Sequence, residues 1–243
     1  MNTKGNTIFI SGGSAGIGLE IAKLFSEKGN KVIINGRNRE RLDKALRQLK
    51  NAVAIQGDLS VESERIRVAE ELKQHHPQVN VIINNAAEAY IYSLDGNGED
   101  SAYAHATKEI TTNYLAVIHF TELLLPLLKE KSRAAVVNVT SIASLRPAAV
   151  IPTYSASKAA LHFYTLSLRK SLSETNVGVY ELIPPMVNTE FSAGIGGATN
   201  GIPPEEVAEE LLAGLEDNRF EIPVGKTKAV HTVLEEAFAQ FQS

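Results

Sequence analysis

Short runs of apolar, largely β-branched residues alternate along this chain with longer stretches in which apolar residues recur at helical spacing. Runs that are apolar at successive positions are typical of buried parallel strands, because both faces of such strands are covered. The sequence predicts strands at 7–11, 31–35, 52–56, 80–85, 134–141, 177–183 and, more briefly, 220–224. It predicts helices at 15–28, 38–50, 61–76, about 99–130, 153–174 and 204–216.

This alternation predicts an α/β fold, a doubly wound parallel sheet with helices on both faces. No proline-, glycine- or serine-rich linker divides the chain and no repeat is evident, so we expect one Rossmann-type domain over residues 1–243. Gly29 stands where the C-cap of the first helix is expected. Segment 189–202 has four glycines and is the most flexible stretch by composition. One last amphipathic helix is predicted from the spacing of Val230, Val233, Leu234, Ala237 and Phe238.

Composition narrows the class of protein. Apolar residues make up 44% of the 243 residues and charged residues 21%, as is ordinary for a soluble globular chain. The net charge of −4 gives no general attraction to nucleic acid or to an anionic membrane. There is no cysteine, and the six histidines lack metal-ligand spacing. No signal-peptide core and no uninterrupted apolar run of about 18 residues is present. We therefore expect a cytoplasmic protein without a metal site, membrane insertion or nucleic-acid partner.

The first predicted strand runs directly into the turn SGGSAGIG and then into a helix. Gly12, Gly16 and Gly18 permit a tight turn, close approach of the backbone to a pyrophosphate, and close packing of helix on strand. The N-terminus of the helix offers free N–H groups to phosphate. The spacing differs from the usual G-x-G-x-x-G, and a glycine-rich turn without a ligand is the alternative. The order of strand, turn and helix favours dinucleotide binding.

The end of the second strand indicates which dinucleotide the chain is expected to bind. An NAD site commonly places a carboxylate there for the ribose 2′-hydroxyl, whereas this chain has Gly36 and then Arg37. A guanidinium suits a 2′-phosphate, so NADP(H) is favoured over NAD(H). The alternative is that Arg37 is an ordinary surface charge.

A pair of residues with catalytic potential lies in the helix predicted at 153–174. Tyr154 and Lys158 are four residues apart and so share one helix face. Composition alone gives roughly 0.4 such pairs by chance, so the pair by itself is a weak signal.

With the other motifs, however, the chain resembles the short-chain dehydrogenase/reductase family over nearly its whole length. The turn from Ser11 to Gly18 is similar to that family's Thr-Gly-x-x-x-Gly-x-Gly, and Ser141 precedes Tyr154 by the family's usual 13 residues. Other matching motifs are Asp58 in QGDLS, NNAA at 84–87, Asn113 in TTNYL, Tyr154-x-x-x-Lys158 and PPMVNT at 184–189. SGGSAGIGLE, KAALHFYTLSLR and PPMVNTE further resemble oxidoreductases found with lipoteichoic-acid D-alanylation genes in Gram-positive bacteria.

The resemblance implies an NADP(H)-dependent reductase or dehydrogenase acting on a carbonyl/alcohol pair. It implies contacts with the cofactor by Gly12, Ser14, Gly16, Ile17, Gly18, Arg37, Asp58, Leu59, Asn85, Ala86, Tyr154, Lys158, Pro184, Val187 and Thr189. Asp58 would contact adenine and Thr189 the nicotinamide amide. An NAD-dependent alcohol dehydrogenase is the alternative within enzymes.

The resemblance also implies four catalytic residues, each with a chemical rationale. Tyr154 would donate the proton, and we expect Lys158 to lower its pKa by favouring phenolate. Lys158 would also hold the ribose hydroxyls of the nicotinamide. Ser141 would orient the substrate oxygen, and Asn113 would hold a water linking Lys158 to solvent. Taken alone, Ser141 is equally typical of a helix cap and Asn113 of a buried backbone partner.

Two positions depart from the family pattern. Ala87 replaces a glycine near the cofactor, and Pro185 replaces the glycine of Pro-Gly, which fixes φ and removes an N–H. We expect an altered pocket wall; the alternative is a dinucleotide-binding regulator with little turnover.

Substrate and assembly are less constrained by the motifs. The segments expected to set substrate choice are 88–98, 142–152, which contains Arg146, and 190–202. Arg146 would meet an anionic substrate group or only solvent. Family members pair through the helices predicted here at 99–130 and 153–174, so a homodimer is expected.

Overall fold

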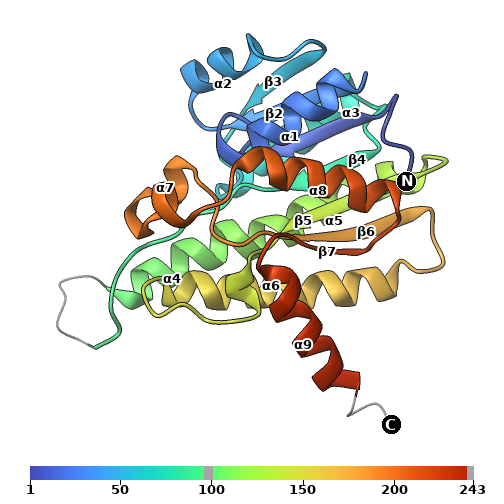
Figure 1. The fold of residues 1–243 in the computed structure, drawn as a ribbon. Helices are drawn as coiled ribbons and strands as arrows, with labels where there is room; N and C mark the ends of the chain where they lie inside the picture. Colours follow the sequence, from blue (N-terminus) through green and yellow to red (C-terminus); the bar gives the residue numbers. More distant parts are fainter. Residues whose placement is uncertain (96–100, 240–243) are drawn as a thin grey trace.

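A single parallel sheet forms the centre of the molecule (Figure 1). The computed structural model describes residues 1–95 and 101–239. Within them the sheet has seven strands in the order β3-β2-β1-β4-β5-β6-β7. The strands are β1 (Thr7–Ser11), β2 (Lys31–Gly36), β3 (Ala52–Gln56), β4 (Val81–Asn84), β5 (Ala134–Val139), β6 (Val177–Ile183) and β7 (Glu221–Pro223). All seven predicted strands, and the predicted fold class, are confirmed.

The helices follow the predicted segments with changes at their ends. They are α1 (Gly16–Glu27), α2 (Arg39–Leu46), α3 (Glu62–His75), α4 (Ala102–Ile110), α5 (Ala116–Lys129), α6 (Pro152–Ser171), α7 (Gly197–Asn200), α8 (Pro204–Glu216) and α9 (Thr227–Ala239). A π-helical turn, Thr111–Leu115, joins α4 to α5. Helix α2 ends at Leu46, four residues before the predicted end. Gly29 follows the end of α1 with φ of +86°, as a helix-terminating glycine does.

Segment 189–202 differs from its expected flexibility. It forms a 3₁₀ helix, Glu190–Ile195, followed by α7. The Ser192 hydroxyl is buried and donates to the Val187 carbonyl, and Gly196 connects the two helices with φ of +85°. The glycines therefore serve a compact double turn, because they supply the conformation that it needs.

Two hydrophobic cores cover the two faces of the sheet. Ile8 and Ile10 of β1 pack toward α1 and α8, whereas Phe9 between them packs toward α3 and α5. This alternation follows from the two-residue period of a strand. Since β1 is flanked by β2 on one side and β4 on the other, the chain reverses its direction of winding there. In such sheets ligands bind in the crevice beyond the carboxyl ends of the strands at that point.

The central strands contain buried polar side chains that the apolar pattern did not suggest. Asn84 donates to Asn138 Oδ1 across β4 and β5 at 2.8 Å, and Asn138 donates to the Thr165 hydroxyl of α6 at 2.9 Å. Glu181 in β6 has no exposed surface. Each of these side chains is hydrogen-bonded, as buried polar groups must be.

One long helical segment of the chain is markedly apolar. The continuous segment Ala102–Lys129 is, by length and composition, apolar enough to cross a membrane. Phe120 and Leu124 of α5 nevertheless lie in the hydrophobic core against the sheet, as in the core helix of a soluble protein.

Helix α9 projects away from the sheet (Figure 1). Its predicted apolar positions are only partly covered, and Val233 is 64% exposed. The side chain of Phe238 lies outside the described part of the chain.

Candidate active site

A pocket of about 590 Å³ opens at the carboxyl ends of the strands, which is the size of a typical small-molecule site. Its walls come from the segments that follow β1 to β6. Of the predicted site residues, those lining it are Gly12, Ser14, Gly16, Ile17, Arg37, Asp58, Leu59, Asn85, Ala86, Ser141, Tyr154, Lys158, Pro184, Val187 and Thr189. Gly18 and Asn113 are the predicted residues outside this lining.

The glycine turn has the geometry of a phosphate cradle. Gly12 and Gly16 have φ of +64° and +54°, a region that favours glycine. A Cβ on Gly12 would lie 2.9 Å from Asn85 Nδ2, and one on Gly16 would lie 3.2 Å from Thr189 Cγ2. Side chains at these positions would fill the cradle, so its shape fits a dinucleotide phosphate approaching the N-terminus of α1. Gly18 lies behind the cradle, where a Cβ would be 2.5 Å from the Gly12 carbonyl oxygen. This position requires close packing, and contact of Gly18 with the cofactor stays a prediction.

The turn is tied to the end of β4 by hydrogen bonds. The Ser11 hydroxyl accepts from the backbone N–H groups of Asn85 and Ala86 at 2.9 and 3.0 Å. The Asn85 amide donates to the Ser11 carbonyl oxygen at 2.9 Å. These bonds hold the two sides of the crevice at a fixed separation.

Arg37 lines the pocket with a 64% exposed side chain that is already paired. Its guanidinium contacts Glu88 at 2.7 Å and Asp58 at 3.7 Å. The Asp58 carboxylate accepts from the backbone N–H and hydroxyl of Ser60. An anionic group that binds Arg37 therefore has to share it with Glu88 or displace that carboxylate.

Tyr154 and Lys158 lie on the face of α6 that is turned toward the pocket. Tyr154 is 7% exposed and Lys158 2% exposed. The Lys158 ammonium donates to the Val139 carbonyl at the end of β5 at 2.8 Å, and its Nζ lies 5.7 Å from the centre of the Tyr154 ring. Pro152 begins α6, where proline is tolerated because the first helical N–H groups need no partner within the helix.

Ser141 connects the end of β5 to Tyr154. Its hydroxyl caps the short 3₁₀ helix Ile142–Ser144 by accepting from the Ala143 N–H at 3.1 Å. The same side chain is hydrogen-bonded to the Tyr154 phenol. The capping role and a role toward Tyr154 are thus both present, since one oxygen accepts while its hydrogen donates.

The expected lowering of the Tyr154 pKa by Lys158 is not what the structure shows. Burial raises the pKa of Tyr154 to about 12; the bond from Ser141 opposes this shift and the nearby Glu109 adds to it. Burial also lowers the pKa of Lys158 to about 7, with Glu181 opposing. Because Tyr154 is so deeply buried, the penalty for a charged phenolate is the largest influence on its pKa. The phenol therefore stays protonated over the neutral pH range.

Asn113 lies in the π-helical turn with no exposed surface. Its amide accepts from the Glu88 N–H and donates to the Glu88 carbonyl and to the Ser157 hydroxyl, at 2.8 to 2.9 Å. The Asn113 side chain is therefore a buried partner of the backbone, which was the alternative interpretation. A role in holding water near Lys158 stays a prediction.

Three acidic residues near the site were missed by the sequence analysis: Glu88, Glu109 and Glu181. Glu109 is fully buried and accepts from the Tyr90 N–H and from Thr153, the neighbour of Tyr154. Glu181 is considered further below. For Glu181 the available signal was a lone charged residue inside an otherwise apolar strand, because such a residue needs a buried partner.

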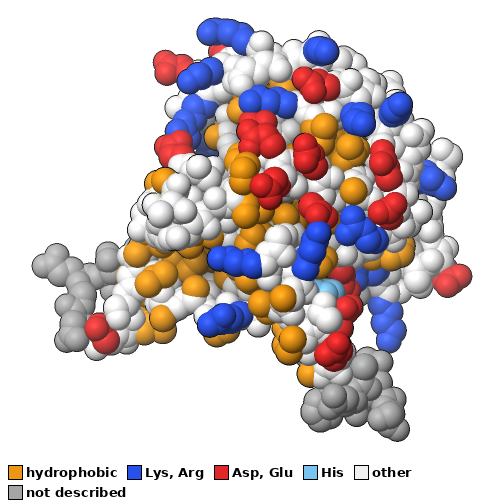
Figure 2. Space-filling model, viewed as in Figure 1, with side chains coloured by type: hydrophobic (Ala, Val, Ile, Leu, Met, Phe, Trp, Pro, Cys, Tyr) orange, Lys and Arg blue, Asp and Glu red, His pale blue; other side chains and the backbone are white. Residues whose placement is uncertain are grey.

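The remaining wall is built from the three segments expected to contact substrate. The Tyr92 N–H donates to the Val150 carbonyl at 3.3 Å, which joins 88–98 to 142–152. The Phe191 ring lies 5.8 Å from the Tyr154 ring. Hydrophobic side chains gather on this face between α7 and α4 (Figure 2). Residues 96–100 lie outside the described part of the chain. Ala87 and Pro185 both line the pocket, and Ala87 packs against the hydrophobic cluster of Ala143, Ile151 and Tyr154.

Comparison with known proteins agrees with this geometry. An uncharacterized oxidoreductase of Bacillus subtilis (strain 168), DltE, is 40% identical over 226 residues, which cover 91% of this chain and 89% of DltE. This similarity confirms the narrower resemblance to oxidoreductases found with D-alanylation genes.

Solved structures show the same fold. A short chain dehydrogenase/reductase from Burkholderia phymatum in complex with NAD has a TM-score of 0.84 at 20% identity, covering 91% of this chain and 89% of that one. A short chain dehydrogenase from Burkholderia cenocepacia in complex with NADP has a TM-score of 0.85 at 24% identity, covering 97% and 94%. A family model described as short chain dehydrogenase matches residues 6–199. With four-fifths of its length matched, the chain belongs to the short chain dehydrogenase family of oxidoreductases.

Proposed function

We propose that this protein is an NADP(H)-dependent oxidoreductase that interconverts a carbonyl and an alcohol, acting as one domain over residues 1–243. The observation that carries the proposal is the meeting of Tyr154, Lys158 and Ser141 with the glycine cradle in one pocket. A bound nicotinamide would supply the hydride or accept it. The residues that would hold the cofactor are those predicted from the sequence, with Gly12 and Gly16 at its phosphates.

The protein's part in the reaction is to place a proton and exclude water. Tyr154 is the proton donor for carbonyl reduction, because burial raises the pKa of Tyr154 to about 12 and so keeps its phenol protonated. Ser141 donates to the oxygen that Tyr154 faces and so orients the substrate. Lys158 donates to the Val139 carbonyl, which fixes the amine beside the ring of Tyr154. The phenol, which is the form that carbonyl reduction needs, is thus the populated form near neutral pH.

Preference for NADP(H) rests on Arg37 and on the absence of a carboxylate at Gly36. The two structures of similar fold were described with NAD and with NADP, so the fold accommodates both cofactors. A 2′-phosphate would replace Glu88 as the partner of Arg37 and gain a charge-assisted bidentate contact. The ribose 2′-hydroxyl of NAD(H) is uncharged and so cannot form a charge-assisted contact with Arg37.

The pocket wall supports an apolar substrate. Ala143, Val150, Ile151, Phe191 and Ile195 line the side near Tyr154. Arg146 also lines the pocket and is exposed. We therefore propose ketones or aldehydes with a hydrophobic substituent, with Arg146 selecting among those that carry a distant anionic group.

A substrate panel tests the proposal. Aliphatic and aromatic ketones and aldehydes, with and without a carboxylate, would be offered with NADPH or NADH, and nucleotide oxidation followed by absorbance. We expect turnover of hydrophobic carbonyls with NADPH preferred. NADPH binding without turnover of any member would instead support the dinucleotide-binding regulator, for which Ala87 and Pro185 are the sequence features.

A further inference from the structure

A buried carboxylate lies behind the candidate active site, on the strand next to the one that ends at Ser141. Glu181 is in the middle of β6 and has no exposed surface. A carboxylate in the interior is costly unless hydrogen bonds or opposite charges compensate it. Its contacts therefore indicate what it does there.

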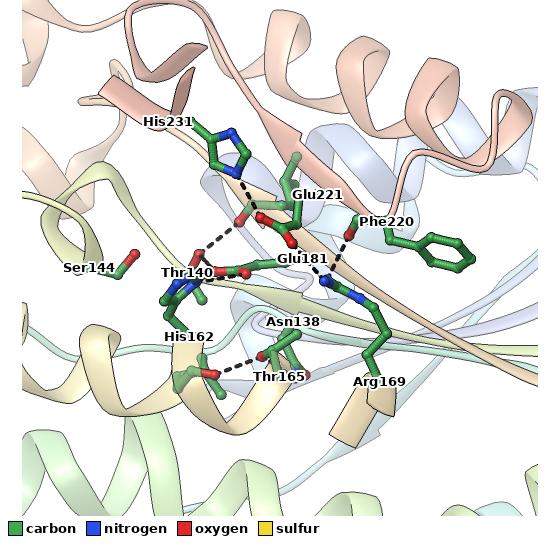
Figure 3. Close-up of polar contacts among 12 residues, drawn as sticks. Asn138, Thr140, Ser144, His162, Thr165, Arg169, Glu181, Phe220, Glu221 and His231 are labelled. Atoms are coloured by element: carbon green, nitrogen blue, oxygen red, sulfur yellow. Dashed lines mark hydrogen bonds and ion pairs between the residues drawn. The ribbon is translucent and has the colours of Figure 1, made fainter. Parts of the chain in front are cut away.

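The contacts of Glu181 lead to both elements that hold the pocket's polar residues. One of its oxygens, Oε1, accepts from the Thr140 hydroxyl at 2.6 Å, and Thr140 immediately precedes Ser141. Both oxygens lie 2.9 Å from Nδ1 of His162, which is one helical turn after Lys158 (Figure 3). Because a carboxylate only accepts, this His162 nitrogen must carry the proton. Glu181 thus joins β5 to α6 directly behind the point where Lys158 meets Val139.

A second carboxylate nearby differs from Glu181 in that it pairs with an arginine as well as a histidine. Glu221 of β7 contacts Arg169 at 2.7 Å and His231 at 2.6 Å (Figure 3). Within the described residues, the hydrogen-bond partners of the Glu181 carboxylate are Thr140 and His162. The charged and titratable groups around it are Lys158, His162 and Arg169 of α6, Glu221 of β7 and His231 of α9. Arg169 is committed to Glu221, which leaves Lys158 as the amine that senses Glu181.

We propose that Glu181 is a positioning residue of this active site: its buried carboxylate, held by Thr140 and His162, favours the charged ammonium form of Lys158. The inference rests on the proposed function, since Lys158 matters to catalysis only there. It agrees with the electrostatics, because burial lowers the pKa of Lys158 and the Glu181 carboxylate opposes that shift. An ammonium has three hydrogens to donate, so after the Val139 carbonyl two remain for the pocket.

Direct titration of Lys158 tests this without any substrate. The ¹³Cε chemical shift of Lys158, assigned with Lys158→Arg, would be followed across pH in the wild type and in Glu181→Gln. Glutamine keeps the size and an acceptor for Thr140 but removes the charge. We expect the Lys158 midpoint to fall by about one pH unit. An unchanged midpoint would overturn the proposal.

Glu221→Gln is the control on the neighbouring strand, since it removes a carboxylate that is partly exposed and pairs with Arg169 and His231. The Lys158 midpoint should stay within a few tenths of a unit; an equal fall in both variants would also overturn the proposal. If Glu181→Gln does not fold, the wild-type Glu181 ¹³Cδ signal serves instead. It should show an inflection at the Lys158 midpoint, and a signal that does not respond there rejects the coupling.

Turnover provides the readout that separates the two proposals. Where the panel identifies a substrate, the pH profile of kcat in Glu181→Gln should move with the Lys158 midpoint while KM changes little. A shifted Lys158 titration in a chain that turns over no carbonyl would leave the inference on Glu181 standing and reject the proposed function.

Discussion

At the scale of single residues, burial of Tyr154 has opposite consequences for the two directions of hydride transfer. With its pKa raised to about 12, Tyr154 is present near neutrality as the phenol that reduction needs and hardly as the phenolate that oxidation needs. Tyr154→Phe removes one oxygen and leaves the buried ring. We expect carbonyl reduction to slow by about 10²–10⁴-fold, the usual scale of general acid catalysis, with NADPH affinity nearly unchanged. Steady-state kinetics and cofactor titration measure both quantities. Tyr164→Phe, on the same helix and outside the pocket lining, is the control, and a fully active Tyr154→Phe would reject the mechanism.

Lys158→Ala should differ from Tyr154→Phe in its effect on cofactor binding. Loss of the amine removes a donor from the pocket, so both turnover and NADPH affinity should fall. Each should drop by about 10-fold or more if a charge-assisted bond is lost. Lys170→Ala, in the last turn of the same helix, should change neither. A variant that loses turnover but binds NADPH as tightly as the wild type would show that Lys158 does not hold the cofactor.

Cofactor preference is a residue-scale property of Gly36 and Arg37. Arg37→Ala should weaken NADPH by about 10- to 150-fold, or about 1.5–3 kcal/mol, and NADH far less. Arg39→Ala, whose side chain pairs with Asp43, is the control. Gly36→Asp should shift preference toward NADH, since a carboxylate repels the 2′-phosphate and accepts from a hydroxyl. Equal losses for both cofactors in Arg37→Ala, measured by titration, would reject the assignment.

The residues that carry a motif could be found from the sequence, whereas their supporting residues could not. Tyr154, Ser141 and the glycines stand at fixed spacings, so the chain order alone brings them to notice. Glu109 and Glu181 act through contacts between elements far apart in sequence, and only the packing of α4 and β6 on α6 brings them near the pocket. The pKa of Tyr154 was predicted in the wrong direction for the same reason, because burial is a property of the packed pocket.

At the scale of elements, α9 is attached to the sheet edge mainly by polar contacts. His231 is hydrogen-bonded to Glu221, which raises the pKa of His231 from 6.5 and lowers the pKa of Glu221 from 4.5 to about 2. A raised histidine pKa contributes stability that is complete below 6.5 and is lost as pH rises through the folded value. The lowered Glu221 pKa contributes stability above 4.5 that is lost as pH falls toward 2. The pair therefore stabilises α9 most between pH 4.5 and pH 6.5.

Amide hydrogen exchange can measure this attachment. After correction for intrinsic rates, protection of α9 should be greater at about pH 6 than at about pH 9, while α8 changes little. His231→Gln should remove the difference. Protection of α9 that is the same at both values in the wild type would contradict a contribution from this pair.

Element prediction succeeded where one physical signal dominated. Apolar runs predicted every strand of the sheet, because buried parallel strands consist mostly of apolar residues. Segment 189–202 was judged flexible because glycine content does not distinguish a mobile loop from a compact turn that needs positive φ. Gly196 at +85° belongs to the second kind.

At the scale of the whole molecule, exposed apolar side chains on α6 and on the turn between α4 and α5 support the proposed homodimer. Phe163 is 62% exposed and Leu115 48% exposed. A two-fold pairing through these helices would cover them on both subunits at once. We expect a dimer at micromolar concentration by sedimentation equilibrium, and Phe163→Glu should dissociate it without unfolding. Ile66→Glu, at an exposed position of α3, should remain dimeric. A monomeric wild type would reject the proposal.

We expect the two arginine–glutamate pairs that line the pocket to change how cofactor binding responds to salt. Arg37 and Arg41 come from the β2 side of the pocket, and their partners Glu88 and Glu190 come from the segments after β4 and β6. Ions in solution weaken the attraction of a phosphate to arginine, but they also weaken the pairs that a phosphate must open. The two effects oppose each other, so NADPH affinity should fall less steeply with ionic strength than in the double variant Glu88→Gln with Glu190→Gln. Equal slopes in titrations of the two proteins would show that the pairs do not compete with the cofactor. If the slopes differ, these acids act as built-in counterions that make cofactor binding less sensitive to changes in the ionic strength of the surroundings.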